Sequence, residues 1–169
     1  GYSGYSGSNG TQGNSGYSGS SGYSGFSGYS GVATVNPSPS SDHTASGLTI
    51  QLTASANFNF GDIGNIASTG KVAFAKADAI ENSSAIVMCS DSSINTDASG
   101  NWLLLGISRD DSWNWTIGGL IYLSTAGTTG NTLTQTAPSG SNNVIQVIGV
   151  ATAATKIYFN PQLIQIEHT

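Results

Sequence analysis

The amino-acid sequence predicts a collagen-like triple helix over residues 1–33, a linker over 34–46 and an all-β domain over 47–169, assembled as a homotrimer. Three observations support this prediction. Glycine stands at every third position from Gly1 to Gly31. A segment rich in Pro and Ser follows it. Beyond that segment, the chain consists of short stretches rich in Ile, Val, Tyr, Phe and Thr, separated by turn residues, as in an all-β domain.

The first 33 residues divide into eleven G-x-y triplets, GYS GYS GSN GTQ GNS GYS GSS GYS GFS GYS GVA. In a collagen triple helix every third residue points at the common axis, where only a residue without a side chain fits. The triplets contain no Pro, so a disordered tract or a Gly-rich extended bundle is the alternative. Such tracts need no fixed period, and the period therefore favours the triple helix. The predicted axis residues are Gly1, Gly4, Gly7, Gly10, Gly13, Gly16, Gly19, Gly22, Gly25, Gly28 and Gly31.

Aromatic residues recur at the x position of the triplets. In a triple helix these side chains point outward, where they either pack along the rod or adhere to glycans, a cell surface or neighbouring rods. The candidate adhesive residues are Tyr2, Tyr5, Tyr17, Tyr23 and Tyr29. A short rod without Pro is marginal alone, so we expect the C-terminal domain to hold three chains at high effective concentration.

The segment TVNPSPSSDHTAS reads as an extended connector, in which we expect His43 to be solvated. After it, apolar alternation and β-branched residues predict short strands, and only residues 76–85 show a weak helical pattern. About 123 residues of such strands indicate a barrel or a sandwich. The predicted strands lie within residues 47–55, 56–60, 62–67, 71–77, 84–90, 101–108, 119–125, 132–137, 143–152, 156–160 and 162–167.

The β region also contains an internal resemblance. The segment GDIGNIAS, which starts at Gly61, is similar to GGLIYLST, which starts at Gly118. Further along, residues 84–88 correspond to 143–147, and residues 102–105 correspond to 156–159. We interpret these pairs as a duplicated β unit that closes one barrel.

Composition excludes several classes of function. Net charge is −5 with only four basic residues, which is the opposite of a nucleic-acid-binding surface. No apolar run approaches the length of a membrane span. The single cysteine, Cys89, rules out an internal disulfide or a Cys-based zinc site, and we expect it in the core. Because the chain begins with Gly1 rather than Met, we expect a processed product or part of a longer one.

Catalytic signatures are missing as well. His43 and His168 are the only histidines, and neither lies in a motif for nucleophilic catalysis, phosphate binding or zinc binding. Positions 95–100, NTDASG, match the start of a calcium-binding loop, but its twelfth position is Gly106 instead of Glu, so we expect a hairpin turn. The sequence therefore predicts no catalytic, cofactor-binding or metal-binding residue, and no enzyme.

The segment SRDDSWNW carries the remaining candidates. Arg109 is expected to pair with an Asp of its own or a neighbouring chain. Trp113 and Trp115 are two residues apart, so they share one face of an extended segment and pack into the core or a trimer interface, or else line a sugar site. The candidate interface residues are Arg109, Asp110, Trp113 and Trp115.

The triplets together with the segments GDIGNIAS, GKVAFAKAD, LLLGISRDDSWNW, GGLIYLS and IYFNP give the chain a general resemblance to collagen-like structural proteins of tailed bacteriophages. In those proteins, G-x-y rods join small β-rich trimeric knobs. The resemblance implies a homotrimeric virion fibre, located on the virion surface or outside cells, without an enzyme signature or a cofactor. Its expected partners are further copies of itself, other virion proteins and cell-surface glycans, with neither nucleic acid nor membrane.

Two other functions stay open from the sequence. One is an extracellular collagen-like adhesin or filament subunit of a microbial cell. The other is a carbohydrate-binding or carbohydrate-active domain carried on a stalk.

Overall fold

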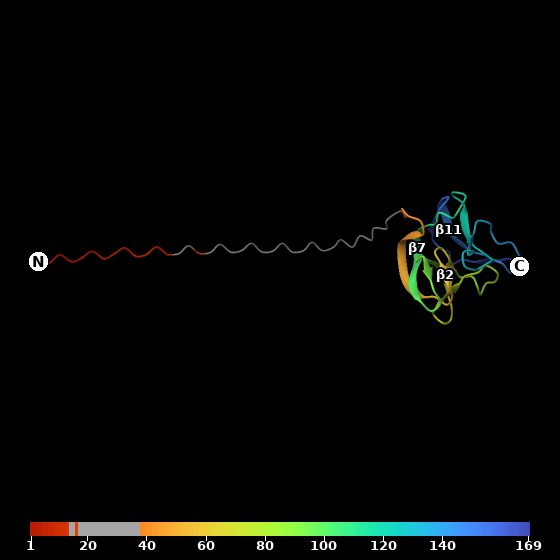
Figure 1. The fold of residues 1–169 in the computed structure, drawn as a ribbon, viewed down its shortest axis with the longest axis horizontal. Helices are drawn as coiled ribbons and strands as arrows, with labels where there is room; N and C mark the ends of the chain where they lie inside the picture. The colour runs from red at the N-terminus through yellow and green to blue at the C-terminus, as the bar shows by residue number, and fades with distance from the viewer. Residues whose placement is uncertain (14–15, 17–37) are drawn as a thin grey trace. The chain divides into compact units, whose positions relative to one another are not determined.

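The computed structural model describes residues 1–13, 16 and 38–169, and the chain separates into two compact units, residues 1–32 and 33–169. The described residues of the first unit are exposed and belong to no helix or strand (Figure 1). No helix long and apolar enough to cross a membrane occurs in the described residues.

The second unit is all-β, which confirms the predicted class, and its described residues contain no helix. Residues 76–85, the one weak helical pattern, form turns instead. The strands are β1 (Thr44–Thr53), β2 (Phe58–Asn59), β3 (Ile63–Ile66), β4 (Val72–Phe74), β5 (Val87–Cys89), β6 (Ser93–Ile94), β7 (Ser99–Arg109), β8 (Leu120–Leu123), β9 (Leu133–Thr134), β10 (Val144–Ile145), β11 (Val147–Ala153), β12 (Lys156–Phe159) and β13 (Ile166–Glu167).

Strand β7 is the centre of the main sheet. Along one edge it pairs with β1 over that strand's whole length. Along the other edge it pairs first with β5, at Trp102 and Leu103, and then with β12, from Gly106 to Arg109. From these two partners the sheet continues as β5-β3-β4 and as β12-β11-β8-β9, and it curls into a half-barrel (Figure 1). We call these two parts the first and second leaves.

The two leaves have the same strand order. In the first, β3 pairs with β4 and β5, and β5 pairs with β7. In the second, β8 pairs with β9 and β11, and β11 pairs with β12. The segments GDIGNIAS and GGLIYLST contain β3 and β8, the strands in equivalent places.

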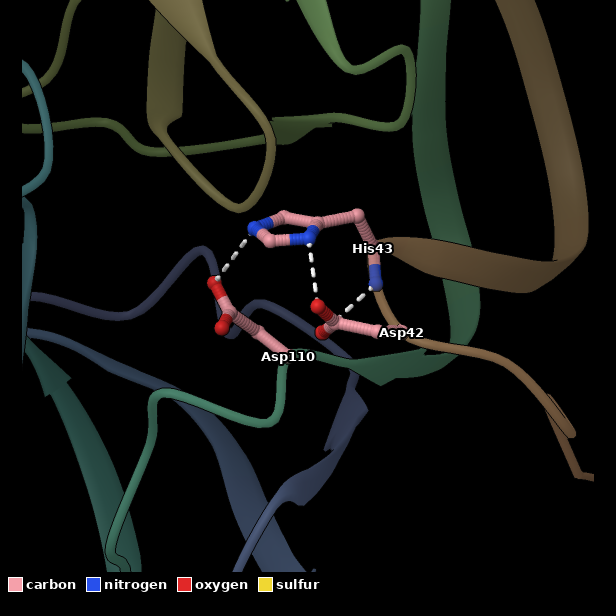
Figure 2. Close-up of side chains that lie close together, drawn as sticks. All are labelled: Asp42, His43 and Asp110. Atoms are coloured by element: carbon pink, nitrogen blue, oxygen red, sulfur yellow. Dashed lines mark hydrogen bonds and ion pairs between the residues drawn. The ribbon is translucent and has the colours of Figure 1, made fainter.

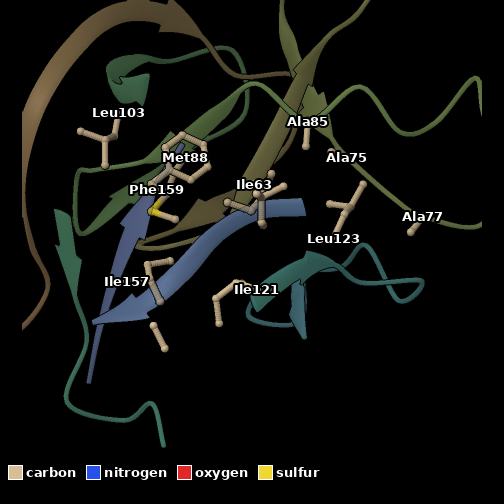
Figure 3. Packing of buried hydrophobic residues seen from close by; sticks show 12 residues of the cluster. Ile63, Ala75, Ala77, Ala85, Met88, Leu103, Ile121, Leu123, Ile157 and Phe159 are labelled. Atoms are coloured by element: carbon tan, nitrogen blue, oxygen red, sulfur yellow. The ribbon is translucent and has the colours of Figure 1, made fainter. Parts of the chain in front are cut away.

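The main hydrophobic core lies between the leaves (Figure 3). Ile63 and Met88 contribute from the first leaf, Leu103 from β7, and Ile121 and Phe159 from the second leaf. Burial of such side chains from water is the principal stabilising term for a domain of this kind.

A second core lies on the opposite side of β7. Trp102 belongs to it although the next residue, Leu103, belongs to the main core, because successive residues of a strand face opposite sides. Phe58 stacks on Phe74 with ring centroids 4.0 Å apart and meets Trp102 edge-on. Cys89 is buried in this core, as expected, and burial raises its pKa to about 12.

Strand β1 begins before residue 47, where the sequence predicts its start. Residues 44–46 are small and show no alternation of large apolar side chains, so no local pattern indicates a strand there. Thr44 pairs with Arg109, so the strand starts inside the predicted linker. The residues before it also contact the β domain. Arg109 donates from Nη1 to the Ser40 carbonyl at 2.7 Å, and Lys156 donates from Nζ to Ser38 Oγ at 2.7 Å.

Candidate functional site

A cavity of about 530 Å³ lies where the start of β1 meets the end of β7. One part of its wall is aromatic and comes from Phe60, Trp113 and Trp115. The polar part comes from His43, Asp62, Asp110, Ser112 and Thr132. A concave surface with aromatic walls and a few convergent polar groups is the usual form of a ligand site.

Asp110 is fixed by the turn that follows β7. Its backbone N–H donates to the Thr155 carbonyl at 3.0 Å, and its own carbonyl accepts from the Trp113 N–H at 3.1 Å. Its Oδ1 accepts from both the backbone N–H and the hydroxyl of Ser112, at 2.8 and 2.6 Å. The side chain is 8% exposed, so this carboxylate is held rigidly at the edge of the cavity.

His43 lies between two carboxylates (Figure 2). Its Nδ1 is 2.9 Å from Asp42 Oδ2, and its Nε2 is 3.6 Å from Asp110 Oδ2. The ring also meets Phe60 edge-on, with centroids 5.4 Å apart. His43 has φ +49°, an uncommon backbone conformation for a residue other than glycine. The ring therefore has contacts on three sides that the sequence does not predict, while its side chain is 49% exposed to solvent.

Asp42 is held by backbone donors. Its Oδ1 accepts from the N–H of Asp111 at 2.7 Å and from the N–H of His43 at 2.9 Å. Mainly because of the hydrogen bond from Asp111, the pKa of Asp42 lies below its usual value. This carboxylate therefore favours its charged form beside the imidazole.

Arg109 finds its partner within the same chain. Its guanidinium makes two parallel hydrogen bonds to Asp111, Nε to Oδ1 at 2.7 Å and Nη2 to Oδ2 at 3.0 Å. The hydrogen bond with Asp111 is the main reason why the pKa of Arg109 is raised. This two-point pair fixes the loop that carries Asp110.

Asp62 forms part of the cavity wall and is almost fully buried. Its Oδ2 accepts from the Asn59 N–H at 2.8 Å, and its Oδ1 accepts from the Gly130 N–H at 2.7 Å. Burial raises its pKa in spite of these donors. The cavity lining thus includes two carboxylates and no Lys or Arg, so it does not favour an anionic ligand.

Trp113 and Trp115 lie together, with ring centroids 5.8 Å apart and planes at 52°. Both pack against the main core and both line the cavity. A side chain on Gly61 would lie 2.9 Å from Trp113 Cζ2, so Gly61 allows the indole to approach the backbone. The Trp115 Nε1–H is buried and finds no acceptor among the described residues.

The other predicted site residues lie elsewhere. Tyr2 and Tyr5 are fully exposed, and the glycines from Gly1 to Gly13 and Gly16 are exposed as well. Asp97, in the calcium-loop-like segment, pairs with Lys71 at 2.6 Å in the turn between β6 and β7. The remaining predicted residues, Tyr17, Tyr23, Tyr29, Gly19, Gly22, Gly25, Gly28 and Gly31, lie outside the described residues.

Sequence reasoning missed Asp42, His43, Asp62 and Thr132 as site residues. No local motif surrounds them, and they meet only because β1, β3, β7 and the segment before β9 converge at this cavity. Comparison of the chain with protein-family models, curated proteins and solved structures finds no match.

Proposed function

We propose that this protein is a homotrimeric surface fibre of a bacteriophage virion, in which residues 1–33 form a triple-helical rod and the β domain joins three chains. The observation that carries the proposal is the unbroken glycine period from Gly1 to Gly31, because a triple helix requires three chains and no side chain at its axis. The two leaves with equal strand order are interpreted as a duplicated β unit.

The outer face of the sheet supports association of the β domains. On this face Leu48 lies opposite Leu105, and Tyr158 lies opposite Ile107. Val150 lies opposite both Tyr158 and Leu120, so apolar side chains continue from β1 across to β8. Leu48, Leu105, Leu120 and Tyr158 are exposed in the single chain. A continuous apolar patch of this kind is typical of a surface that meets another protein.

The cavity supports adhesion to neutral sugars. Aromatic rings such as Trp113 offer apolar faces to the C–H groups of a sugar, while Asp62 and Asp110 accept hydrogen bonds from its hydroxyls. No Lys or Arg stands among the described residues that line the cavity, and this disfavours sialylated or sulfated sugars. Both nitrogens of His43 face carboxylates and not a hydroxyl or thiol nucleophile, which supports binding without catalysis.

The rod and the trimer are tested together on the purified full chain. We expect sedimentation equilibrium to give three chains per particle and circular dichroism to show a cooperative melt of the rod. Gly16→Ala should lower the temperature of that melt, because a methyl group at the axis disrupts the triple helix. A Gly70→Ala change in the β domain is the matched control. A monomer at micromolar concentration, or an unchanged melt in Gly16→Ala, would contradict the proposal.

Sugar binding is tested on an array that carries neutral and anionic glycans. We expect the array to retain neutral glycans only. Trp113→Ala should lower the affinity for these glycans by up to about tenfold, since a stacked ring contributes up to about 1.5 kcal/mol. Tyr122→Ala, which removes an aromatic ring of β8 that does not line the cavity, is the control. Preference for anionic glycans, or unchanged binding by a folded Trp113→Ala protein, argues against this use of the cavity. Electron microscopy with labelled chains separates a virion fibre from a cellular filament.

A further inference from the structure

Two carboxylates direct their remaining lone pairs at one imidazole. Asp42 and Asp110 each use Oδ1 to accept two hydrogen bonds, Asp42 from the backbone and Asp110 from Ser112. In each residue it is Oδ2 that faces His43. One ligand atom from each of the three residues lies within 4.8 Å of the others (Figure 2).

The contact between His43 and Asp110 is not a hydrogen bond. Nδ1 of His43 is 2.9 Å from Asp42 Oδ2, which is the distance of a donated hydrogen bond, so Nδ1 carries a proton. Nε2 lies 3.6 Å from Asp110 Oδ2, beyond hydrogen-bond distance. In the neutral ring, Nε2 therefore presents a lone pair to a carboxylate oxygen, an arrangement that a cation between the two atoms stabilises.

The burial of Asp110 gives independent support. Its side chain is more than nine-tenths buried, and a buried carboxylate is costly unless positive charge or hydrogen bonds compensate it. Oδ2 accepts no hydrogen bond from the described residues and faces His43 Nε2. The neighbouring cation, Arg109, does not compensate its charge, because the guanidinium is hydrogen-bonded to Asp111. The contact given for Oδ2 among the described residues is thus the one with His43 Nε2, and a cation fits beside these two atoms.

We infer that His43 Nε2 and Asp110 Oδ2 bind a divalent transition-metal ion such as Zn²⁺, with Asp42 as the residue that positions the imidazole. Tetrahedral ligands at about 2.0–2.2 Å from zinc lie about 3.4 Å apart, close to the observed 3.6 Å between Nε2 and Oδ2. A carboxylate on the second nitrogen of a metal-binding histidine is the usual supporting contact. An imidazole in the ligand set favours zinc over calcium or magnesium.

Such an ion would connect the residues before β1 with the turn after β7. Two protein ligands leave further coordination positions for water or for a hydroxyl group of a ligand in the cavity. The inference does not depend on sugar binding, because it rests on the three side chains alone. Its failure would leave the proposed fibre and the proposed sugar site untouched.

The test is calorimetric titration of the full chain with ZnCl₂ after treatment with a chelator. We expect one ion per chain and a higher unfolding temperature of the β domain with zinc. Asp110→Asn and His43→Gln should each weaken zinc binding by about tenfold or more, and Asp42→Asn by about tenfold through loss of the positioning contact. Asparagine at position 110 keeps an oxygen for Ser112, and His43 is about half exposed, so at least one variant is expected to fold.

His168→Gln and Asp97→Asn are the matched controls, since each removes the same chemical group elsewhere in the β domain, and both should bind zinc like the unchanged chain. Several outcomes would overturn the inference. They are no saturable zinc binding, equal binding in folded His43→Gln and Asp110→Asn, or tighter binding of Ca²⁺ than of Zn²⁺. If only His168→Gln reduced binding, the ion would belong to a different site and the inference would also fail.

Discussion

Gly106→Ala is expected to lower the free energy of unfolding of the β domain by about 4 kcal/mol or more, a large part of the roughly 5–15 kcal/mol of an ordinary domain. Gly106 lies on β7 opposite Gly47 on β1, with φ values of +156° and +155°. A Cβ on Gly106 would overlap the Ser46 carbonyl, and a Cβ on Gly47 would overlap the Leu105 carbonyl. Both obstacles are backbone atoms, so relief requires separation of the longest strand pair in the sheet.

Urea unfolding followed by tryptophan fluorescence measures this loss. Gly70→Ala is the control, because Gly70 also has positive φ, +76°, but no atom lies within 4 Å of its added Cβ. This control should lose only about 1–2 kcal/mol, the cost of the left-handed backbone conformation. Equal midpoints for the two variants would show that the β1–β7 pair can separate at this point without cost.

The strands around Gly106 show which features of the fold can be predicted from the sequence and which cannot. Apolar, β-branched stretches predict most strands correctly, because their side chains need a buried face wherever they pair. The partner of Gly106 is not predictable in this way, since Gly47 lies far away in sequence and the need for glycine arises only when the two backbones meet. The early start of β1 at Thr44 has the same origin, because pairing with Arg109, and not local apolar pattern, makes those residues a strand.

In the site, too, contacts between residues close in sequence are predictable, whereas contacts between distant residues are not. Trp113 and Trp115 were predicted to share a face, and Arg109 to pair with an Asp, because these relations depend on residues close in sequence. The surroundings of His43 depend on Asp110, which lies beside it only because Thr44, at the start of β1, pairs with Arg109, at the end of β7. The linker composition around His43 therefore does not predict its contacts with Asp110 and Phe60, although the side chain is still about half exposed. Asp62 is not predicted as a site residue, because its place in the cavity depends on Gly130 and Thr132.

The internal resemblance predicted which strands occupy equivalent places in the two leaves, and it also contains an informative exception. In that resemblance Gln146 corresponds to Val87, and both side chains are fully buried. Val87 packs in the second core. Gln146 accepts from the Ala85 N–H at 2.9 Å and donates to the carbonyls of Ala85 and Gln162 at 2.9 and 2.7 Å. At this position of the segment NVIQVIG, hydrogen bonds from a buried amide to the backbone of Ala85 and Gln162 thus take the place of apolar packing.

Gln146→Leu is accordingly expected to lower the free energy of unfolding by about 2–4 kcal/mol, although leucine has nearly the same size. The change leaves the N–H and carbonyl of Ala85 without their partner in a buried place, and each such group costs about 1–3 kcal/mol. Gln51→Leu, on the exposed side of β1, should change stability by about 0.5 kcal/mol or less. Because Ala85 precedes β5 of the first leaf and Gln146 precedes β11 of the second, the amide also connects the two leaves. Equal urea midpoints for the two leucine variants would mean that packing alone holds the leaves together.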